Sequence, residues 1–329
     1  MYAPYRSAYR QLVPGLLLAG IVLLCLMLLG NLNLVGLSLI KFKWVYFPLA
    51  VGLTFLSQTV RFLKRAVNFH QSGVRKVSFM ESFRLFIASF PLAITPYRVG
   101  ESFKGIWLFR ASGIPVERGV SVFLVDQISD GLSVFVLIVV GILAFPTLWP
   151  LFASVFLAFL AATIFLKVNP LKARNSSSGV RSLEFARILS HLRNGIETNP
   201  ALFTAGNLTV TLFLGILSWT VEGAALFFVL VGLGLPPSLP IVATAVLVFA
   251  FSTTVSLVTN LHGGLGVVEL AMAIMLTLLL NFRPEIAVAA TILFRLATFW
   301  TSFFIGMLLW SFSGKSLGLS SRESRIIES

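Results

Sequence analysis

The chain has 329 residues, of which 57% are hydrophobic and 11% charged, and its formal net charge is +13. Soluble domains carry about 25% charged residues, so this composition excludes a soluble protein and indicates an integral membrane protein. Apolar runs of about 17 to 25 residues match membrane-spanning helices and not barrel strands. The basic residues gather between these runs, so the charge indicates orientation in a membrane, and no nucleic-acid partner is expected.

The apolar runs predict an all-α polytopic bundle of about eight transmembrane helices, forming a single integral membrane domain over 1–329. The predicted spans are 14–31, 45–63, 120–144, 150–167, 202–231, 240–259, 264–281 and 286–311. Prolines and glycines interrupt the chain near 80–112 and 261–281, which predicts re-entrant or broken helices there. Hydrocarbon offers no partner to unpaired backbone groups, so such breaks persist only within protein or beside a water-filled cavity.

Loop charges predict the topology. Basic residues follow the second, fourth and last spans, whereas the turns at 144–150 and 232–240 carry no charge. The positive-inside rule then places both termini in the cytoplasm, with 168–200 as a cytoplasmic basic loop and 313–329 as a cytoplasmic polar tail. The basic residues that follow the second span are Lys64, Arg65, Arg75 and Lys76.

Ionisable residues within or beside the spans each cost several kcal/mol if left alone in lipid, so we expect them to face one interior and pair there. Arg98, Glu101 and Lys104 are spaced by three and would share one helix face. Asp126 and Asp130 are spaced by four and share another. The two aspartates could instead be solvated acids that favour the helix dipole at the start of a span.

Glu222 and Arg295 lie deep in the fifth and last predicted spans. They could form a structural salt bridge or line a substrate path. The glycines of 263–266 precede Glu269, where backbone amides at a helix start could hold an anion, or the glycines could simply permit close helix packing. The predicted substrate-binding residues are Arg98, Glu101, Lys104, Asp126, Asp130, Glu222, Gly263, Gly264, Gly266, Glu269 and Arg295.

Catalytic patterns are nearly lacking in the sequence. His70, His191 and His262 have no metal-ligand spacing with cysteine or acids. No P-loop or nucleophile elbow is found. We therefore expect no catalytic residue, no metal and no cofactor, and predict a site that binds and passes on a charged group.

Several motifs resemble those of one known family, in order and spacing, over nearly the whole chain. Residues 96–101, 113–115 and 125–130 resemble its P-x-R-x-G-E, G-I-P and V-E-R-x-x-D motifs, with Asp126-Gln127 where Glu-Arg is usual. Residues 262–269 resemble its P-G-G-x-G-x-x-E element, with His262 in place of proline. Trp219 to Glu222, and Phe294-Arg295-Leu296 followed by Gly306, also fit. This is the lysylphosphatidylglycerol synthase transmembrane-region family, also described as flippase-like integral membrane proteins.

The resemblance implies a multi-pass protein of a bacterial or archaeal inner membrane. Its best-understood relatives form the lipid-flipping half of the multiple peptide resistance factor, which moves aminoacylated phosphatidylglycerol across the bilayer. Other members are linked to polyprenyl-phosphate sugars or hopanoid lipids. The sequence contains no cytosolic aminoacyl-transferase domain, so lipid aminoacylation by this chain is not expected.

We therefore predict a flippase-like transporter that binds an anionic phospholipid or lipid-linked headgroup in an intramembrane polar cavity. Arg98 and Arg295 would contact phosphate, and Asp126 and Asp130 would order the cytoplasmic mouth. The arginines, or an amine or hydroxyl of the headgroup, would be held by three carboxylates: Glu101, Glu222 and Glu269.

Two alternatives stay open. The first is a membrane-embedded glycosyl- or headgroup transferase in which Asp126 and Asp130 bind a metal or act as base. The second is an accessory subunit or scaffold of a lipid-synthesis enzyme. Candidate partners are accordingly membrane lipids, a second copy of the chain and such an enzyme.

Overall fold

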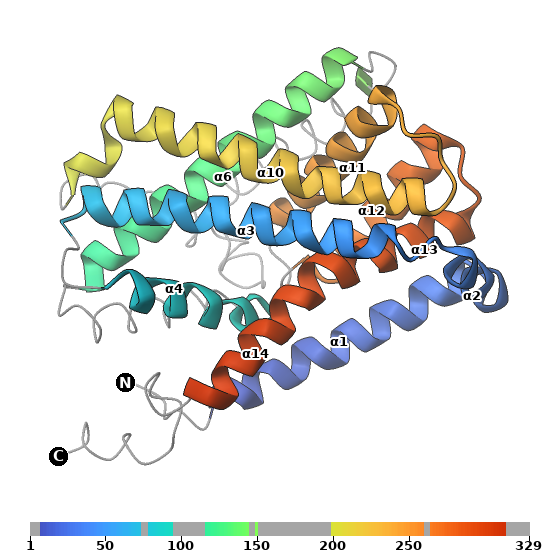
Figure 1. Ribbon diagram of the computed structural model, residues 1–329, viewed down its shortest axis with the longest axis horizontal. Helices are drawn as coiled ribbons and strands as arrows, with labels where there is room; N and C mark the ends of the chain where they lie inside the picture. Colours follow the sequence, from blue (N-terminus) through green and yellow to red (C-terminus); the bar gives the residue numbers. More distant parts are fainter. Residues whose placement is uncertain are drawn as a thin grey trace, which may run out of the picture.

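The computed structural model describes residues 7–73, 78–94, 116–144, 149–150, 199–259 and 264–313. Within these ranges all regular secondary structure is helical, which confirms the predicted all-α class (Figure 1). The elements are α1 (Ser7–Leu29), α2 (Leu32–Lys41), α3 (Tyr46–Gln71), α4 (Phe79–Ala88), the 3₁₀ turn η1 (Phe90–Ile94), α6 (Val116–Ala144), the 3₁₀ turn η3 (Pro200–Phe203), α10 (Ala205–Gly232), α11 (Leu239–Thr259), α12 (Val267–Leu280), α13 (Pro284–Arg295), the π-helical turn η5 (Leu296–Trp300) and α14 (Thr301–Ser313). The predicted span 150–167, the loop 168–200 and the tail 313–329 fall almost wholly outside the described residues.

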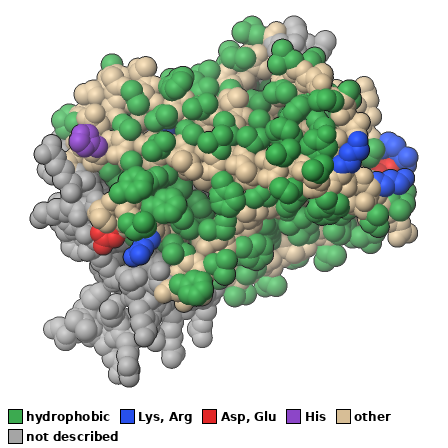
Figure 2. All heavy atoms as spheres, viewed as in Figure 1, with side chains coloured by type: hydrophobic (Ala, Val, Ile, Leu, Met, Phe, Trp, Pro, Cys, Tyr) green, Lys and Arg blue, Asp and Glu red, His purple; other side chains and the backbone are tan. Residues whose placement is uncertain are grey.

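Several described helices are long and apolar enough to cross a membrane. Four qualify alone: Ser121–Leu143, Ala205–Gly232, Leu239–Ser256 and Pro284–Phe312. A fifth candidate is the pair Leu12–Leu28 and Leu32–Lys41, which is bent by 95°. Figure 2 shows hydrophobic side chains spread over the middle of one face, with charged side chains gathered toward its two ends. These features fit a multi-pass membrane protein and are roughly consistent with the predicted eight spans.

Helix α10 lies at the centre of the bundle. It packs against α3, α6, α11 and α13, and Figure 1 shows α3 and α10 running side by side. Leu226, Val229 and Leu230 of α10 are fully buried in the main hydrophobic core. The same core takes in buried side chains of α11, α12 and α13, so residues far apart in sequence enclose one interior.

Glycines allow α10 to approach its neighbours closely. A Cβ atom on Gly223 would lie 2.9 Å from the Cα atom of Val246 in α11, and one on Gly215 would lie 2.2 Å from the Oγ atom of Ser133 in α6. Small residues let helix backbones pack tightly where lipid supplies no hydrophobic driving force.

The predicted break near 80–112 is confirmed in its described part. Pro91 has no N–H to continue α4, which ends at Ala88, and η1 follows. The carbonyl of Ala88 instead accepts a hydrogen bond from the indole Nε1 of Trp310 in α14, at 2.8 Å. Gly306 of α14 faces the ring of Pro91, so α14 covers the break closely.

The breaks of the C-terminal half are also helical interruptions. Helix α12 begins after Gly264 and Gly266, whose φ angles of +69° and +85° favour glycine. The last predicted span, 286–311, is one continuous rod of α13, η5 and α14, but the π-helical turn directly follows Arg295. Such turns insert one extra residue into a helix and occur often at functional sites.

We predict that Gly223→Leu destabilises the protein by about 1–3 kcal/mol, because the new side chain would be forced against the backbone of α11. Thermal unfolding in detergent measures the change. Gly52→Leu is the matched control, since a Cβ atom at that position of α3 would meet nothing within 4 Å. Equal melting temperatures for the two variants would contradict the close α10–α11 contact.

Candidate functional site

A polar cavity of about 320 Å³ lies inside the bundle, between α3, η1, α6, α10 and the α13–η5–α14 rod. Its volume is at the lower end of the range of about 300–1,000 Å³ that is typical of small-molecule sites. Besides polar and aromatic side chains, the described lining has four cations and three carboxylates: Arg61, Lys64, Arg65, Arg295, Asp126, Asp130 and Glu222.

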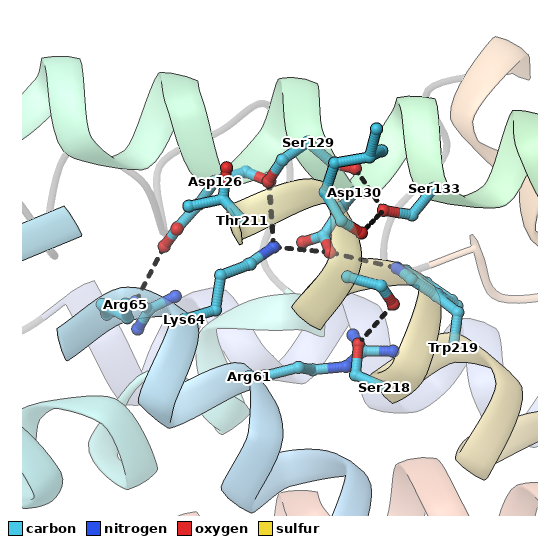
Figure 3. Close-up of polar contacts among 12 residues, drawn as sticks. Arg61, Lys64, Arg65, Asp126, Ser129, Asp130, Ser133, Thr211, Ser218 and Trp219 are labelled. Carbon is cyan, nitrogen blue, oxygen red and sulfur yellow. Dashed lines mark hydrogen bonds and ion pairs between the residues drawn. The ribbon is translucent and has the colours of Figure 1, made fainter. Parts of the chain in front are cut away.

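Helix α3 supplies three of the four cations. Arg61, Lys64 and Arg65 lie on one face because residues three and four apart are neighbours on a helix. Figure 3 shows how this face meets α6 and α10. Ion pairs join Arg61 Nη2 to Glu222 Oε2 at 2.5 Å, Lys64 Nζ to Asp130 Oδ1 at 2.7 Å, and Arg65 Nε to Asp126 Oδ2 at 3.1 Å.

Lys64 is the most deeply buried of these cations, with 2% of its surface exposed. Its ammonium donates to Asp130 Oδ1, to Ser129 Oγ at 3.2 Å and to the backbone oxygen of Asp126 at 3.3 Å. All three N–H donors are therefore satisfied, as a buried ammonium requires. The three acceptors all lie on α6, so Lys64 fixes α3 against that helix.

Trp219 of α10 links two of the ion pairs. Its Nε1 donates to Asp130 Oδ1 at 3.0 Å, so this oxygen is shared with Lys64. The guanidinium carbon of Arg61 lies 4.0 Å from the centre of the Trp219 ring. This cation–π contact and the bond to Glu222 together hold the guanidinium of Arg61 in place.

A chain of amides orients Asp126. Asn68 Nδ2 donates to Asp126 Oδ1 at 2.6 Å, and Asn207 Nδ2 donates to Asn68 Oδ1 at 3.0 Å. Both asparagines are buried. The amide nitrogen of Asn68 donates to the carboxylate, so its amide oxygen is free to accept from Asn207. All donors in this chain therefore point from Asn207 toward Asp126.

Arg295 enters the lining of the cavity from α13. Its Nε donates to Glu269 Oε1 at 2.6 Å, and its guanidinium carbon lies 4.2 Å from the centre of the Phe299 ring. The second oxygen of Glu269, Oε2, accepts from the backbone N–H of Gly266 at 2.8 Å. The start of α12 is thereby tied to Arg295 of α13.

Two arginine nitrogens at the cavity keep unused donors. Arg61 Nε and Arg295 Nη2 are buried and have no hydrogen-bond partner among the described residues. A buried donor without a partner costs about 1–3 kcal/mol, more for a charged group, so an acceptor that reached it would be bound favourably.

The structure brings most of the described candidate residues together. Asp126, Asp130, Glu222 and Arg295 line the cavity, and Glu269 lies behind Arg295. Glu222 and Arg295 do not pair with each other, because each has another partner, and both line the cavity. Two glycines lie at the start of α12: Gly264 and Gly266. Four candidates fall outside the described residues: Arg98, Glu101, Lys104 and Gly263.

The three cations of α3 were missed as site residues. Lys64 and Arg65 were predicted to be loop charges after a span that ends at 63. That prediction was wrong, because α3 continues to Gln71 and both side chains point into the bundle toward α6. A sequence signal existed in the spacing of the polar residues along α3, where Ser57, Arg61 and Asn68 are joined in steps of three or four through either Lys64 or Arg65.

Comparison with known proteins identifies the family. Residues 13–306 match the family model described as the lysylphosphatidylglycerol synthase TM region, whereas no curated protein matches the chain. Because this match spans most of the sequence, the chain belongs to that family, and the resemblance seen in its motifs is confirmed.

We predict that Lys64→Met destabilises the protein by about 3–5 kcal/mol, because it leaves the carboxylate of Asp130 without its cation. The double variant with Asp130→Asn removes both charges and should recover a large part of this loss. Thermal unfolding in detergent measures both. Lys43→Met, at an exposed lysine, is the control and should melt like the wild type. A double variant no more stable than Lys64→Met would contradict the pairing.

Proposed function

We propose that this member of the family binds the phosphate of an anionic lipid headgroup in the polar cavity and moves the lipid between the two leaflets. The observation that carries the proposal is the presence of Arg61 and Arg295 in the lining of a charged cavity within an apolar helical bundle. Each of them also has one guanidinium nitrogen, Nε in Arg61 and Nη2 in Arg295, that donates to no described residue. Guanidinium groups suit phosphate because their N–H donors form a planar fork.

The paired charges support reversible binding. Arg61 and Arg295 each already contact one carboxylate, Glu222 and Glu269. A phosphate that approaches either guanidinium competes with that carboxylate, so part of the energy gained is spent on weakening an existing pair. A transport site needs this balance, because a headgroup held too tightly would not be released on the other side.

The cavity would also lower the main energetic barrier to lipid movement. A charged headgroup is costly to move through hydrocarbon, whereas a polar path within protein replaces part of its hydration. We propose an inner-membrane location with both termini in the cytoplasm. With Lys64 and Arg65 assigned to the bundle, the orientation depends on Arg75 and Lys76 and on the basic residues of 167–193 and 315–325.

Transport is favoured over catalysis by the state of the two aspartates. Asp126 accepts from Arg65 and Asn68, and Asp130 accepts from Lys64 and Trp219. Each carboxylate is thus paired with a cation of α3, Asp126 with Arg65 and Asp130 with Lys64. This pairing supports a structural role for both, because a metal ion bound at either one would be repelled by that cation.

We predict that Arg61→Lys and Arg295→Lys each slow lipid exchange by about tenfold, because lysine keeps the charge and can keep the ion pair but loses the planar fork. Exchange of a fluorescent phosphatidylglycerol between leaflets is measured in reconstituted vesicles. Arg283→Lys is the matched control. This arginine is exposed, lies outside the described lining of the cavity and should leave the rate unchanged.

Two results would oppose the proposal. Exchange that neither arginine variant alters, over a panel of anionic headgroups, would leave transport without support. Chemical turnover of the lipid by the wild type, detected by mass spectrometry of the same vesicles, would favour a headgroup transferase instead.

A further inference from the structure

We infer that a narrow apolar groove beside the cavity holds an acyl chain of the lipid whose headgroup occupies the cavity. This inference deepens the proposed function and rests on it. The groove lies between α1 on one side and α13 and η5 on the other, and its lining includes Val22, Leu23 and Leu26 of α1 and Leu296 and Trp300 of η5.

The groove has the chemistry of a hydrocarbon site. Apart from Glu269 and Arg295, its described lining consists of apolar side chains. Its free volume is about 30 Å³, which is far too small for a headgroup. The apolar lining suits hydrocarbon, and the free volume has room for a few methylenes near the headgroup. Beyond them the chain would lie against the exposed side chain of Leu296.

The groove and the polar cavity meet at one residue. Arg295 lines both of them, and its partner Glu269 also lines the groove. A phosphate bound to Arg295 would therefore have its glycerol and first methylenes close to the groove. Leu296 lines the groove and is 41% exposed, so this wall also reaches the lipid-facing surface of the bundle.

The groove would guide the chain rather than add affinity. An acyl chain in a bilayer is already surrounded by hydrocarbon, so little hydrophobic free energy is gained when it enters a protein groove. The groove would keep the chain in apolar surroundings while the headgroup lies in the polar cavity. The decisive measurement is therefore the position of the chain and not the strength of binding.

The position can be read by photolabelling in nanodiscs. The probe is a phosphatidylglycerol with a diazirine in the first methylenes of one acyl chain, and the labelled residues are identified by mass spectrometry. We expect the groove residues Val22, Leu23, Leu26, Leu296 and Trp300 to be labelled about tenfold more than the lipid-facing surface around Leu308 and Phe312, which are 59% and 85% exposed. The same diazirine on a diacylglycerol, which has no phosphate, should label the two regions equally.

Filling the groove should remove the signal. Leu296→Trp is expected to lower labelling of the groove about tenfold and to leave labelling around Leu308 unchanged. Leu308→Trp is the control, as it places the same bulk on the exposed face of α14. Leu23→Phe fills the groove from the opposite wall and is expected to act in the same way, should Leu296→Trp fail to fold.

Labelling and exchange separate the two ideas. Uniform labelling of the groove and the control face, or equal groove labelling by the diacylglycerol probe, overturns the acyl-chain site and leaves the transport proposal standing. Groove labelling that depends on phosphate and is lost in Leu296→Trp supports the site, even if the wild type exchanges no lipid and the transport proposal fails.

Discussion

The buried ammonium of Lys64 is the constraint on which the rest of the bundle depends. A charge in an apolar interior must be paired and fully hydrogen-bonded, and α6 meets this need with Asp130, Ser129 and a backbone oxygen. Because Asp130 also accepts from Trp219, one carboxylate brings α3, α6 and α10 to a common point. The relative placement of these three helices then determines which side chains can face the cavity.

The arginines that line the cavity are paired in the same way. Each cavity arginine has a carboxylate partner and an aromatic ring beneath it, so its guanidinium is held from two directions. A ring contact can remain in place when the carboxylate is displaced, because stacking and in-plane hydrogen bonding use different parts of the guanidinium. Arg61 and Arg295 can therefore exchange one anionic partner for another without losing their position, which is the property that a transport site requires.

The sequence was sufficient for the class, for the breaks and for several cavity residues. Hydropathy identifies an all-α membrane protein, and prolines and glycines locate the interruptions before η1 and α12. Lys64 and Arg65 were missed because the predicted span ended at 63, just before them, and Arg61 was passed over inside that span. The partners of Lys64 and Arg65, which are Asp130 and Asp126, lie about sixty positions further along the chain, and Glu222, the partner of Arg61, lies further still. Only the packing of α3 on α6 shows that these charges neutralise each other, since no local pattern records a tertiary contact.

The break before α12 has a role beyond helix geometry. One oxygen of Glu269 accepts from the N–H of Gly266, and the other accepts from Arg295. A phosphate that took the place of Glu269 at Arg295 would release a carboxylate that also caps the first turn of α12. Occupancy of the proposed headgroup site would thus be linked to the conformation at the start of α12. Because Arg295 also borders the groove beside α1, this link lies at the junction of the polar and apolar paths.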